Sequence, residues 1–481
     1  MADPTPAEPV RRSSRGGFFF LLFTCAAIYV GYKLRASYNV FDVQPFKFKP
    51  RPPLTGPLAP NTRLQAMERL LENGIQGPES IEVVDGKLYA GTGEGKVVEI
   101  TDGKLTDEYL LVPGCSSIRE CGRPLGIRHL KDKEFVVADP YRGLLLVNMN
   151  NKSHRVVLAA ETLIEGAPMR FADDLDVLDE DTVLLSDCST RWELMHFFVE
   201  MLEMKPTGRV LKVDLRTGEV TVLARDLYFA NGMQLFPDKQ SIVVGESTAA
   251  RLIRLYLSGP KAGQKEVFLD NMPGFPDNVR LSSDGKSFWV ACYAARVLDK
   301  FSFSDTVMEY PLVRRLILSL IPGDLLTHIF TAWKQKHAIA IQLSMKGEII
   351  ASLHDPSAKV LVDVTQVSPH FHQRINSFRS TRTANSSTWE AITLPMLVDY
   401  ENKRAKQGWG TRLVALNPIK EGAARSVAFL AMADRVRSPK EARRSTLSWS
   451  KVLLLVVTGF AVYVGVKLKR SYEIYDVRVV P

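Results

Sequence analysis

Apolar and polar residues alternate along most of the chain in short runs, which Gly, Pro, Asp and Asn turns separate. This pattern is typical of β-strands. Six stretches share one order: a short alternating strand, a polar turn, and a strongly apolar strand. The stretches begin at Gly77, Gly122, Phe171, Phe229, Phe275 and Lys336.

The spacing of these stretches predicts the fold. Intervals of 46, 48, 58, 46 and 60 residues separate the equivalent positions Glu79, Leu125, Asp173, Asn231, Asp277 and His337. A period near 46 with about four strands is typical of a propeller blade, whereas a β-sandwich has no fixed period. A WD40 propeller is disfavoured because its Gly-His and Trp-Asp pairs are absent. We therefore expect an all-β, six-bladed propeller over residues 61–380.

The two longest intervals contain apolar insertions, at 191–205 and 312–333, that are helix-like. We interpret both as lids that narrow an apolar cleft over one propeller face. Surface helices packed on the rim are the alternative. For 312–333, contact with a membrane surface is a third interpretation, because Arg314 and Arg315 lie beside many Leu and Ile residues.

The pattern decays after His354, and residues 381–431 are polar and irregular. A propeller needs its last blade to close the ring, because an unpaired sheet edge is unfavourable. Either the sixth blade is incomplete, or this region of the sequence results from mis-splicing.

Near the N-terminus, an uncharged stretch at 16–32 follows three arginines and ends at Lys33. Its 17 residues would span roughly 25 Å as a helix, just under the thickness of a bilayer core. We expect a transmembrane signal anchor, with 1–15 cytoplasmic and 33–60 a linker. A cleaved signal peptide is the alternative, although no clean small-residue cleavage site follows the stretch.

The C-terminus repeats this segment. Residues 463–477 match 29–43 at nine of fifteen positions without a gap, and they belong to a second anchor-like stretch at 432–481. Two copies of one anchor on either side of a single domain cannot both insert with the same orientation. We hypothesise that 432–481 is the beginning of a tandem paralogue, joined by a real fusion or by an error in the gene model.

The formal net charge of +9 is concentrated at these two ends. Residues 1–51 carry +5 and 432–481 carry +6, so the rest of the chain sums to −2. A slightly acidic body without a zinc-finger, RNP-like or Walker motif argues against a nucleic-acid partner. The charge instead indicates topology, with the lipid bilayer as the partner.

Residues in one register of successive blades lie at one depth around the propeller axis, so Glu79, Asp173, Asn231 and Asp277 are expected to converge. With the adjacent Asn278 they form a set of oxygen donors suited to Ca²⁺. Such a cation would polarise an ester carbonyl and stabilise the oxyanion. The alternative is that these are turn residues, since Asn-Gly and Pro-Asp are common in turns.

Three motifs carry a family resemblance: YFANGMQLFPDKQSIVVGES at 228–247, GFPDNVRLSSDG at 274–285 and GRPLGIR at 122–128. They resemble the adipocyte plasma membrane-associated and hemomucin-type members of the strictosidine synthase-like family, which is distantly related to the paraoxonases. The resemblance covers about residues 20–360. It implies a type II membrane glycoprotein of the ER or plasma membrane, with a lumenal or extracellular six-bladed propeller and arylesterase-type hydrolysis.

The resemblance also bears on the site. Glu79, Asn231, Asp277 and Asn278 match positions of paraoxonase calcium ligands, whereas Asp173 stands where those enzymes have Asn. The paraoxonase histidine pair is missing, because its positions hold Leu125 and Tyr293.

His337, in the expected sixth axial position, is the remaining candidate base, although a lone His is more often a core residue. The last-blade glutamate of strictosidine synthase has no counterpart, which argues against amine–aldehyde condensation.

Cysteines and sequons bear on the compartment. Cys115 and Cys121 lie in a loop where this family commonly has a disulfide, and a bridge there would agree with an oxidising lumen; two free thiols are the alternative. Cys188 and Cys292 are expected in the core. The sequon at Asn151 is a glycosylation candidate in a turn; a second lies at Asn385.

Two function classes follow. The first is a Ca²⁺-dependent hydrolase of small apolar esters or lactones, with arylesterase or lactonase activity. The second is a non-enzymatic receptor or adhesion propeller in which calcium only holds the blades together. The missing histidine pair favours the second class.

Overall fold

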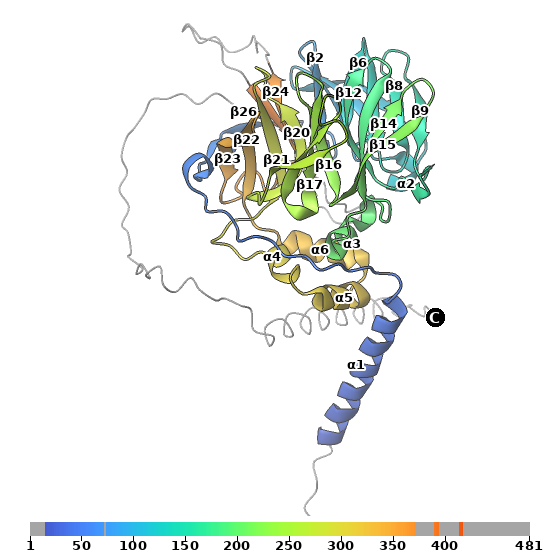
Figure 1. Cartoon of the computed structure of the whole chain (residues 1–481), viewed down its shortest axis with the longest axis vertical. Coiled ribbons are helices and arrows are strands. Elements are labelled where there is room, and N and C mark those ends of the chain that lie inside the picture. The colour runs from blue at the N-terminus through green and yellow to red at the C-terminus, as the bar shows by residue number, and fades with distance from the viewer. Residues whose placement is uncertain (1–14, 72–73, 372–388, 394–412, 417–481) are drawn as a thin grey trace, which may run out of the picture.

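The computed structural model describes residues 15–71, 74–371, 389–393 and 413–416. These residues contain six four-stranded antiparallel sheets and one two-stranded sheet, and the four-stranded sheets surround a common axis (Figure 1). The prediction of a β-propeller is confirmed. We number the four-stranded sheets blade 1 to blade 6.

Five blades each use four consecutive strands. Blade 1 contains β2 (Ile81–Val84), β3 (Lys87–Gly91), β4 (Lys96–Thr101) and β5 (Lys104–Leu110); blade 2 contains β6 (Ile127–Lys131), β7 (Glu134–Asp139), β8 (Gly143–Asn148) and β9 (Ser153–Ala159). Blade 3 contains β12 (Ala172–Asp179), β13 (Thr182–Asp187), β14 (Gly208–Asp214) and β15 (Val220–Leu227); blade 4 contains β16 (Ala230–Leu235), β17 (Ser241–Glu246), β18 (Arg251–Tyr256) and β19 (Lys265–Leu269). Blade 5 contains β20 (Gly274–Leu281), β21 (Ser287–Ala295), β22 (Ala338–Ser344) and β23 (Ile349–Asp355). The strands β10 (Leu163–Ile164) and β11 (Ala167–Pro168) form the small hairpin before blade 3.

Blade 6 combines both ends of the propeller. It contains β24 (Gln366–Phe371), β25 (Trp389–Thr393), β26 (Leu413–Leu416) and, as its outer strand, β1 (Met67–Leu70). Pairing of β1 with β26 joins the strand that precedes blade 1 to the last strand of the ring. The unpaired edge expected from the decayed sequence pattern is thereby covered. The segments 381–388, 394–412 and 417–481, which include the second anchor-like stretch, lie outside the described residues.

The two apolar insertions are helical. The first forms η3 (Leu194–His196) and α3 (Phe197–Glu203) between β13 and β14; the second region forms α4 (Phe303–Val307), α5 (Pro311–Leu320) and α6 (Gly323–Trp333) between β21 and β22. Both connections leave the propeller at the end of the axis where the innermost strands begin. Their apolar side chains share one core, exemplified by Phe198, Ile317 and Phe330. We call α3 to α6 the lid; it covers this end of the propeller (Figure 1).

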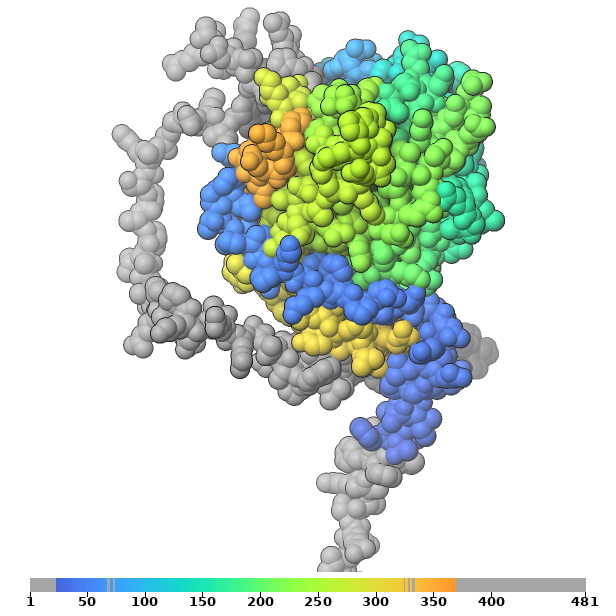
Figure 2. Space-filling model, in the orientation of Figure 1, coloured from blue at the N-terminus to red at the C-terminus, as the bar shows by residue number. Residues whose placement is uncertain are grey.

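The N-terminal part runs from α1 (Arg15–Ser37) across the lid to blade 6 (Figure 2). We call residues 38–65, with η1 (Gly56–Leu58) and η2 (Arg63–Gln65), the strap. At the end of α1, Ser37 Oγ and Ser319 Oγ of α5 are 2.5 Å apart. In the described part of the chain, no helix was found that is both long and apolar enough to cross a membrane. The anchor at 16–32 stays a prediction.

Two further short helices lie in the connections between strands. They are α2 (Ile118–Cys121), before blade 2, and η4 (Ser247–Ala249), between β17 and β18.

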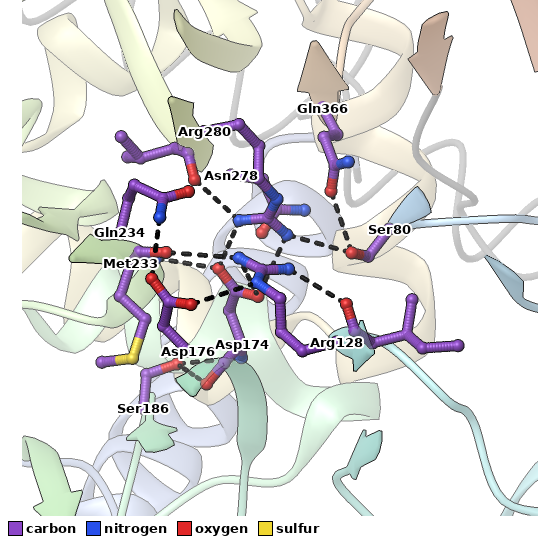
Figure 3. Close-up of polar contacts among 12 residues, drawn as sticks. Ser80, Arg128, Asp174, Asp176, Ser186, Met233, Gln234, Asn278, Arg280 and Gln366 are labelled. Atoms are coloured by element: carbon purple, nitrogen blue, oxygen red, sulfur yellow. Dashed lines mark hydrogen bonds and ion pairs between the residues drawn. The ribbon is translucent and has the colours of Figure 1, made fainter. Parts of the chain in front are cut away.

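A buried ionic network lies at the centre of the axis (Figure 3). Arg280 Nη1 and Nη2 donate to the two carboxylate oxygens of Asp174 at 2.7 and 3.1 Å, and Arg128 Nη2 lies 3.6 Å from the same carboxylate. Arg280 Nη2 also donates to Ser80 Oγ at 3.0 Å, and Ser80 Oγ donates to Gln366 Oε1 at 2.9 Å.

The third blade adds Asp176, whose carboxylate accepts hydrogen bonds from the side chain of Gln234 and the backbone of Leu235. All six blades therefore contribute to one set of contacts, which fixes the blades relative to one another.

We predict that Arg280→Met, which leaves Asp174 buried beside one fewer cation, lowers the free energy of unfolding by about 3–5 kcal/mol. Chemical denaturation of the two proteins measures this change. Asp181→Asn, an exposed position in the β12–β13 turn of blade 3, is the control and should change stability by less than about 0.5 kcal/mol. A loss for Arg280→Met as small as the control's would contradict the central role of the network.

Candidate functional site

The structure brings the five predicted ligand residues together at the lid end of the axis. Glu79, Asp173, Asn231 and Asp277 are 5–7% exposed, and Asn278 is fully buried. Asn278 Nδ2 donates to Glu79 Oε1 at 2.5 Å, although these residues are 199 positions apart. Convergence of the register is confirmed; the metal-binding role stays a prediction.

Local backbone irregularities aim these side chains at the axis. The pairing register shifts between Ala172 and Leu175 in blade 3, between Ala230 and Met233 in blade 4, and between Pro276 and Val279 in blade 5. Each shift encloses the predicted ligand position. A β-bulge inserts an unpaired residue and re-aims its side chain, as often occurs beside functional sites.

Close backbone packing between blades also requires glycine here. A Cβ on Gly232 would lie 2.3 Å from the Asp277 carbonyl oxygen, and one on Gly126 would lie 2.6 Å from that of Asp173. The polypeptide of one blade therefore supports the ligand residue of the next.

In two blades, the residue at this register position is not one of the predicted ligands. Blade 2 has Leu125 there, as the spacing predicts. Blade 6 has Thr365, which the sequence reasoning missed. Asn278 N donates to the Thr365 carbonyl at 2.9 Å, and Thr365 Oγ1 donates to the Glu79 carbonyl at 3.0 Å. The sequence signal for Thr365 was the tripeptide Thr-Gln-Val at 365–367. It has two polar residues followed by an apolar one, as in Asp-Asn-Val at 277–279.

The site concentrates buried negative charge. Burial, reinforced by the carboxylates of Asp173 and Asp174, raises the pKa of Glu79 to about 8. Burial likewise raises the pKa of Asp173 to about 7, opposed by a hydrogen bond from Cys188 Sγ to Asp173 Oδ2 at 2.9 Å. Burial and the carboxylates of Glu79 and Asp173 raise the pKa of Asp277 well above its usual value. A cation at this point would relieve the mutual repulsion.

The donor chemistry fits a hard cation. Asn231 Oδ1 and Asn278 Oδ1 are buried and accept no hydrogen bond from the described residues, which is unfavourable for amide oxygens. Carboxylate and amide oxygens are the ligands that Ca²⁺ takes. Within the described ranges, no three His, Cys, Asp or Glu side chains by themselves form a metal-holding group. A cation here would therefore depend on the two amides as well as the carboxylates.

His337 lies elsewhere, so the expected sixth axial position is wrong. It immediately precedes β22, the third strand of blade 5, because the insertion that forms α4 to α6 separates β21 from β22. His337 Nε2 is 2.8 Å from His354 Nδ1, and His354 Nε2 is 2.9 Å from Ser352 Oγ. Ser352 Oγ in turn donates to the Pro57 carbonyl of the strap at 2.6 Å. The imidazole pair thus links blade 5 to the strap.

The cysteine prediction is confirmed for Cys115 and Cys121, which form a disulfide. Cys188 and Cys292 are free and buried, as expected. Cys188, however, hydrogen-bonds a site carboxylate rather than serving only as core packing.

The predicted glycosylation residue Asn151 is exposed in the turn between β8 and β9. Asn385 lies outside the described residues.

Fold and site together define a β-propeller with buried carboxyl and amide groups at the lid-covered end of its axis. The family models for strictosidine synthase and for the N-terminal part of strictosidine synthase-like proteins match residues 173–260 and 56–100. Adipocyte plasma membrane-associated protein of Mus musculus is 36% identical over 345 residues, which cover 70% of this chain and 82% of that protein. The chain belongs to the strictosidine synthase-like family, alongside the adipocyte plasma membrane-associated proteins.

Other relatives agree. Human adipocyte plasma membrane-associated protein is 37% identical over 345 residues, with the same coverage, and strictosidine synthase-like 10 of Arabidopsis thaliana is 34% identical over 321 residues, covering 61% of this chain and 80% of that one. Among solved structures, a luciferin-regenerating enzyme matches with 12% identity and a TM-score of 0.46, covering 73% of this chain and 95% of that one.

The buried histidine pair predicts a pH dependence of stability. Burial, with a smaller contribution from Lys300, lowers the pKa of His337 from 6.5 to about 4; burial and then His337 lower the pKa of His354 to about 4. Asp299 and Asp355 oppose the shift of His337. Because the unfolded chain then binds protons more readily, stability is retained above pH 6.5 and is lost as pH falls toward 4.

Replacing His337 with Gln should flatten the fall in stability between about pH 6.5 and 4, measured as midpoints of denaturant unfolding at several pH values. His129→Gln, in blade 2, is the matched control and should keep the wild-type slope. An unchanged slope in His337→Gln would contradict the assignment.

Proposed function

We propose that the protein is a Ca²⁺-dependent hydrolase of small apolar esters or lactones, acting at the lid end of the propeller axis. One observation carries the proposal: three buried carboxyl groups and two buried amides from blades 1, 3, 4 and 5 converge there, and both amide oxygens lack a hydrogen bond from the described residues. When bound, the cation would supply Lewis-acid polarisation of a carbonyl.

The chain's own residues provide the rest of the environment. The carboxyl groups of Glu79, Asp173 and Asp277, with the amides of Asn231 and Asn278, would hold the ion. Phe171 and Phe229, 5.2 Å apart and two residues before the ligands of blades 3 and 4, provide an apolar wall. The lid residue Phe197 packs against this wall, and exclusion of water there would strengthen electrostatic interactions at the site.

The second candidate is a non-enzymatic receptor or adhesion propeller with structural calcium. It is favoured by the absence of any histidine among the described residues of the site, since a proton-transfer partner of the usual kind is then missing. In that case the ion would only hold the blades in place.

We also propose that the protein is a single-pass type II membrane protein, anchored by 16–32 with the propeller on the lumenal or extracellular side. The names of the relatives as plasma membrane-associated proteins and the disulfide between Cys115 and Cys121 support this topology.

The hydrolase proposal predicts loss of activity with loss of the ion. Purified full-length protein in detergent should hydrolyse aryl acetates or small lactones with added Ca²⁺ and lose this activity in excess chelator. Asp277→Asn and Asn231→Ala should each weaken Ca²⁺ affinity by at least the ~10- to 100-fold seen when metal-site support is removed. Titration calorimetry and initial rates measure the two effects.

Asp284→Asn is the matched control, because Asp284 is exposed in the β20–β21 turn of the same blade as Asp277. Activity that survives chelation and both site substitutions would refute the metal-dependent mechanism. A Ca²⁺-dependent rise in the unfolding temperature without hydrolysis would instead support the receptor candidate.

The topology predicts glycosylation of Asn151. Protein from membranes of a eukaryotic host should shift on gel electrophoresis after glycosidase treatment, and the double substitution Asn151→Gln and Asn385→Gln should abolish the shift. Ser153→Thr keeps the sequon and is the control. Absence of a shift in the wild-type protein would contradict a lumenal propeller.

A further inference from the structure

Arg123 is a buried arginine that forms no close ion pair among the described residues, although the charges of Glu79, Asp139 and Asp173 act on it. Its side chain lies at the lid end of the axis, two residues before Leu125, and the residue is 4% exposed. Among the described residues, no carboxylate oxygen lies within 4.0 Å of its guanidinium. Its guanidinium makes one hydrogen bond within that part of the chain, from Nη1 to the carbonyl of Pro124 at 3.5 Å, the limit of such a contact.

Other deeply buried arginines have close hydrogen-bond acceptors. Arg209, Arg280 and Arg296 donate to Asp187, Asp174 and Asp305 at 2.6, 2.7 and 2.6 Å. Arg314 has no acid partner among the described residues but donates to two backbone carbonyls, at 2.6 and 2.5 Å. Because a buried guanidinium without close acceptors is strongly unfavourable, an additional acceptor at Arg123 would be stabilising.

The surroundings of Arg123 indicate the shape of such a ligand. In the same register, blades 3, 4 and 5 carry Phe171, Phe229 and Phe275. Phe171 and Phe229 belong to one apolar cluster with Leu125, against which the lid residue Phe197 packs. The guanidinium of Arg123 and an aromatic cluster thus occur in the same register at this end of the axis.

A second unused donor lies near Arg123. The hydroxyl of Tyr141 is buried and donates no hydrogen bond within the described part of the chain, while the backbone of Met195 lies close enough to oppose the rise that burial causes in its pKa. Burial lowers the pKa of the Arg123 guanidinium, and this shift is opposed by the charges of Glu79, Asp139 and Asp173 and then by that of Tyr141, which places Tyr141 in the vicinity of Arg123. Phenol and guanidinium groups both donate to carboxylates, and hydrogen bonds from a charged donor are the stronger.

We infer that Arg123 and Tyr141 bind the carboxylate of an amphiphilic organic acid whose aromatic or alkyl body contacts Phe171 and Phe229. The inference rests on the proposed function in placing this ligand at the same end of the axis, where hydrolysis of an ester or lactone would release a carboxylate. Binding itself requires no hydrolysis. A cation at the neighbouring carboxyl groups would add a second positive charge and strengthen the attraction.

The test compares an acid with its uncharged analogue. Titration calorimetry with full-length protein in detergent uses 4-phenylbutyrate and 4-phenylbutyramide, which share a body and differ in charge. The acid should bind at least ~10-fold more tightly than the amide, because charge-assisted hydrogen bonds are lost with the amide. Each titration is run with excess Ca²⁺ and with excess chelator.

Variants locate the preference. Arg123→Gln should abolish the difference between acid and amide, Arg123→Lys should keep part of it, and Tyr141→Phe should weaken acid binding several-fold. Arg216→Gln, in the exposed β14–β15 turn, is the control and should bind both compounds as the wild type does.

Equal binding of acid and amide by the wild-type protein overturns the inference, as does acid binding that is unchanged in folded Arg123→Gln. If Arg123→Gln does not fold, the inference is tested by comparing acid and amide binding in the wild-type protein and in Arg123→Lys. Arg123-dependent acid binding without ester or lactone hydrolysis leaves the inference standing and removes the proposed function. Hydrolysis without a preference for the acid supports the proposed function and overturns the inference about Arg123.

Discussion

The rest of the structure depends on the ion pair between Arg280 of blade 5 and Asp174 of blade 3. Six sheets that meet at an axis bring backbone and side-chain polar groups into a space with little water, where an unpaired charge would be unstable. This pair, flanked by Arg128, satisfies that charge and ties non-adjacent blades together. Pairing of β1 with β26 closes the ring, and the axial contacts link the innermost strands of the blades to one another.

Nearer the lid, convergence of the blades at the axis leaves buried charge that is not compensated. There Glu79, Asp173 and Asp277 are buried with too few cations close by, so their carboxyl groups hold protons more tightly than usual. Two adjacent layers of one axis thus differ. In the layer of Arg280 and Asp174, each carboxylate lies beside a guanidinium, whereas the layer nearer the lid holds the amide oxygens of Asn231 and Asn278, which accept no hydrogen bond from the described residues. Buried polar groups without partners are rare in a well-packed protein, which is a physical reason to place the functional site at these residues.

The sequence predicted the propeller and the converging residues because similar stretches recur at a regular spacing in five blades, which places Glu79, Leu125, Asp173, Asn231 and Asp277 at equivalent positions. It failed for His337 because intervals along a sequence do not distinguish an insertion inside a blade from a boundary between blades. Thr365 was missed because the repeat weakens after blade 5. Arg123 escaped notice because its register, two positions earlier, holds Phe in three blades and shows no common chemistry.

The strap connects these features mechanically. Near α1, its Gln44 N donates to the Glu203 carbonyl of α3 at 2.8 Å, and Arg314 of α5 donates to the Gln44 carbonyl. At the other end, Asn61 Nδ2 donates to the Ser352 carbonyl of blade 5 at 3.0 Å before the chain enters β1. A single segment therefore fixes α1, the lid and the closing strand together. Because α1 leaves the body on the lid side (Figure 1), any constraint on α1 acts at the same end of the axis as the buried carboxyl groups.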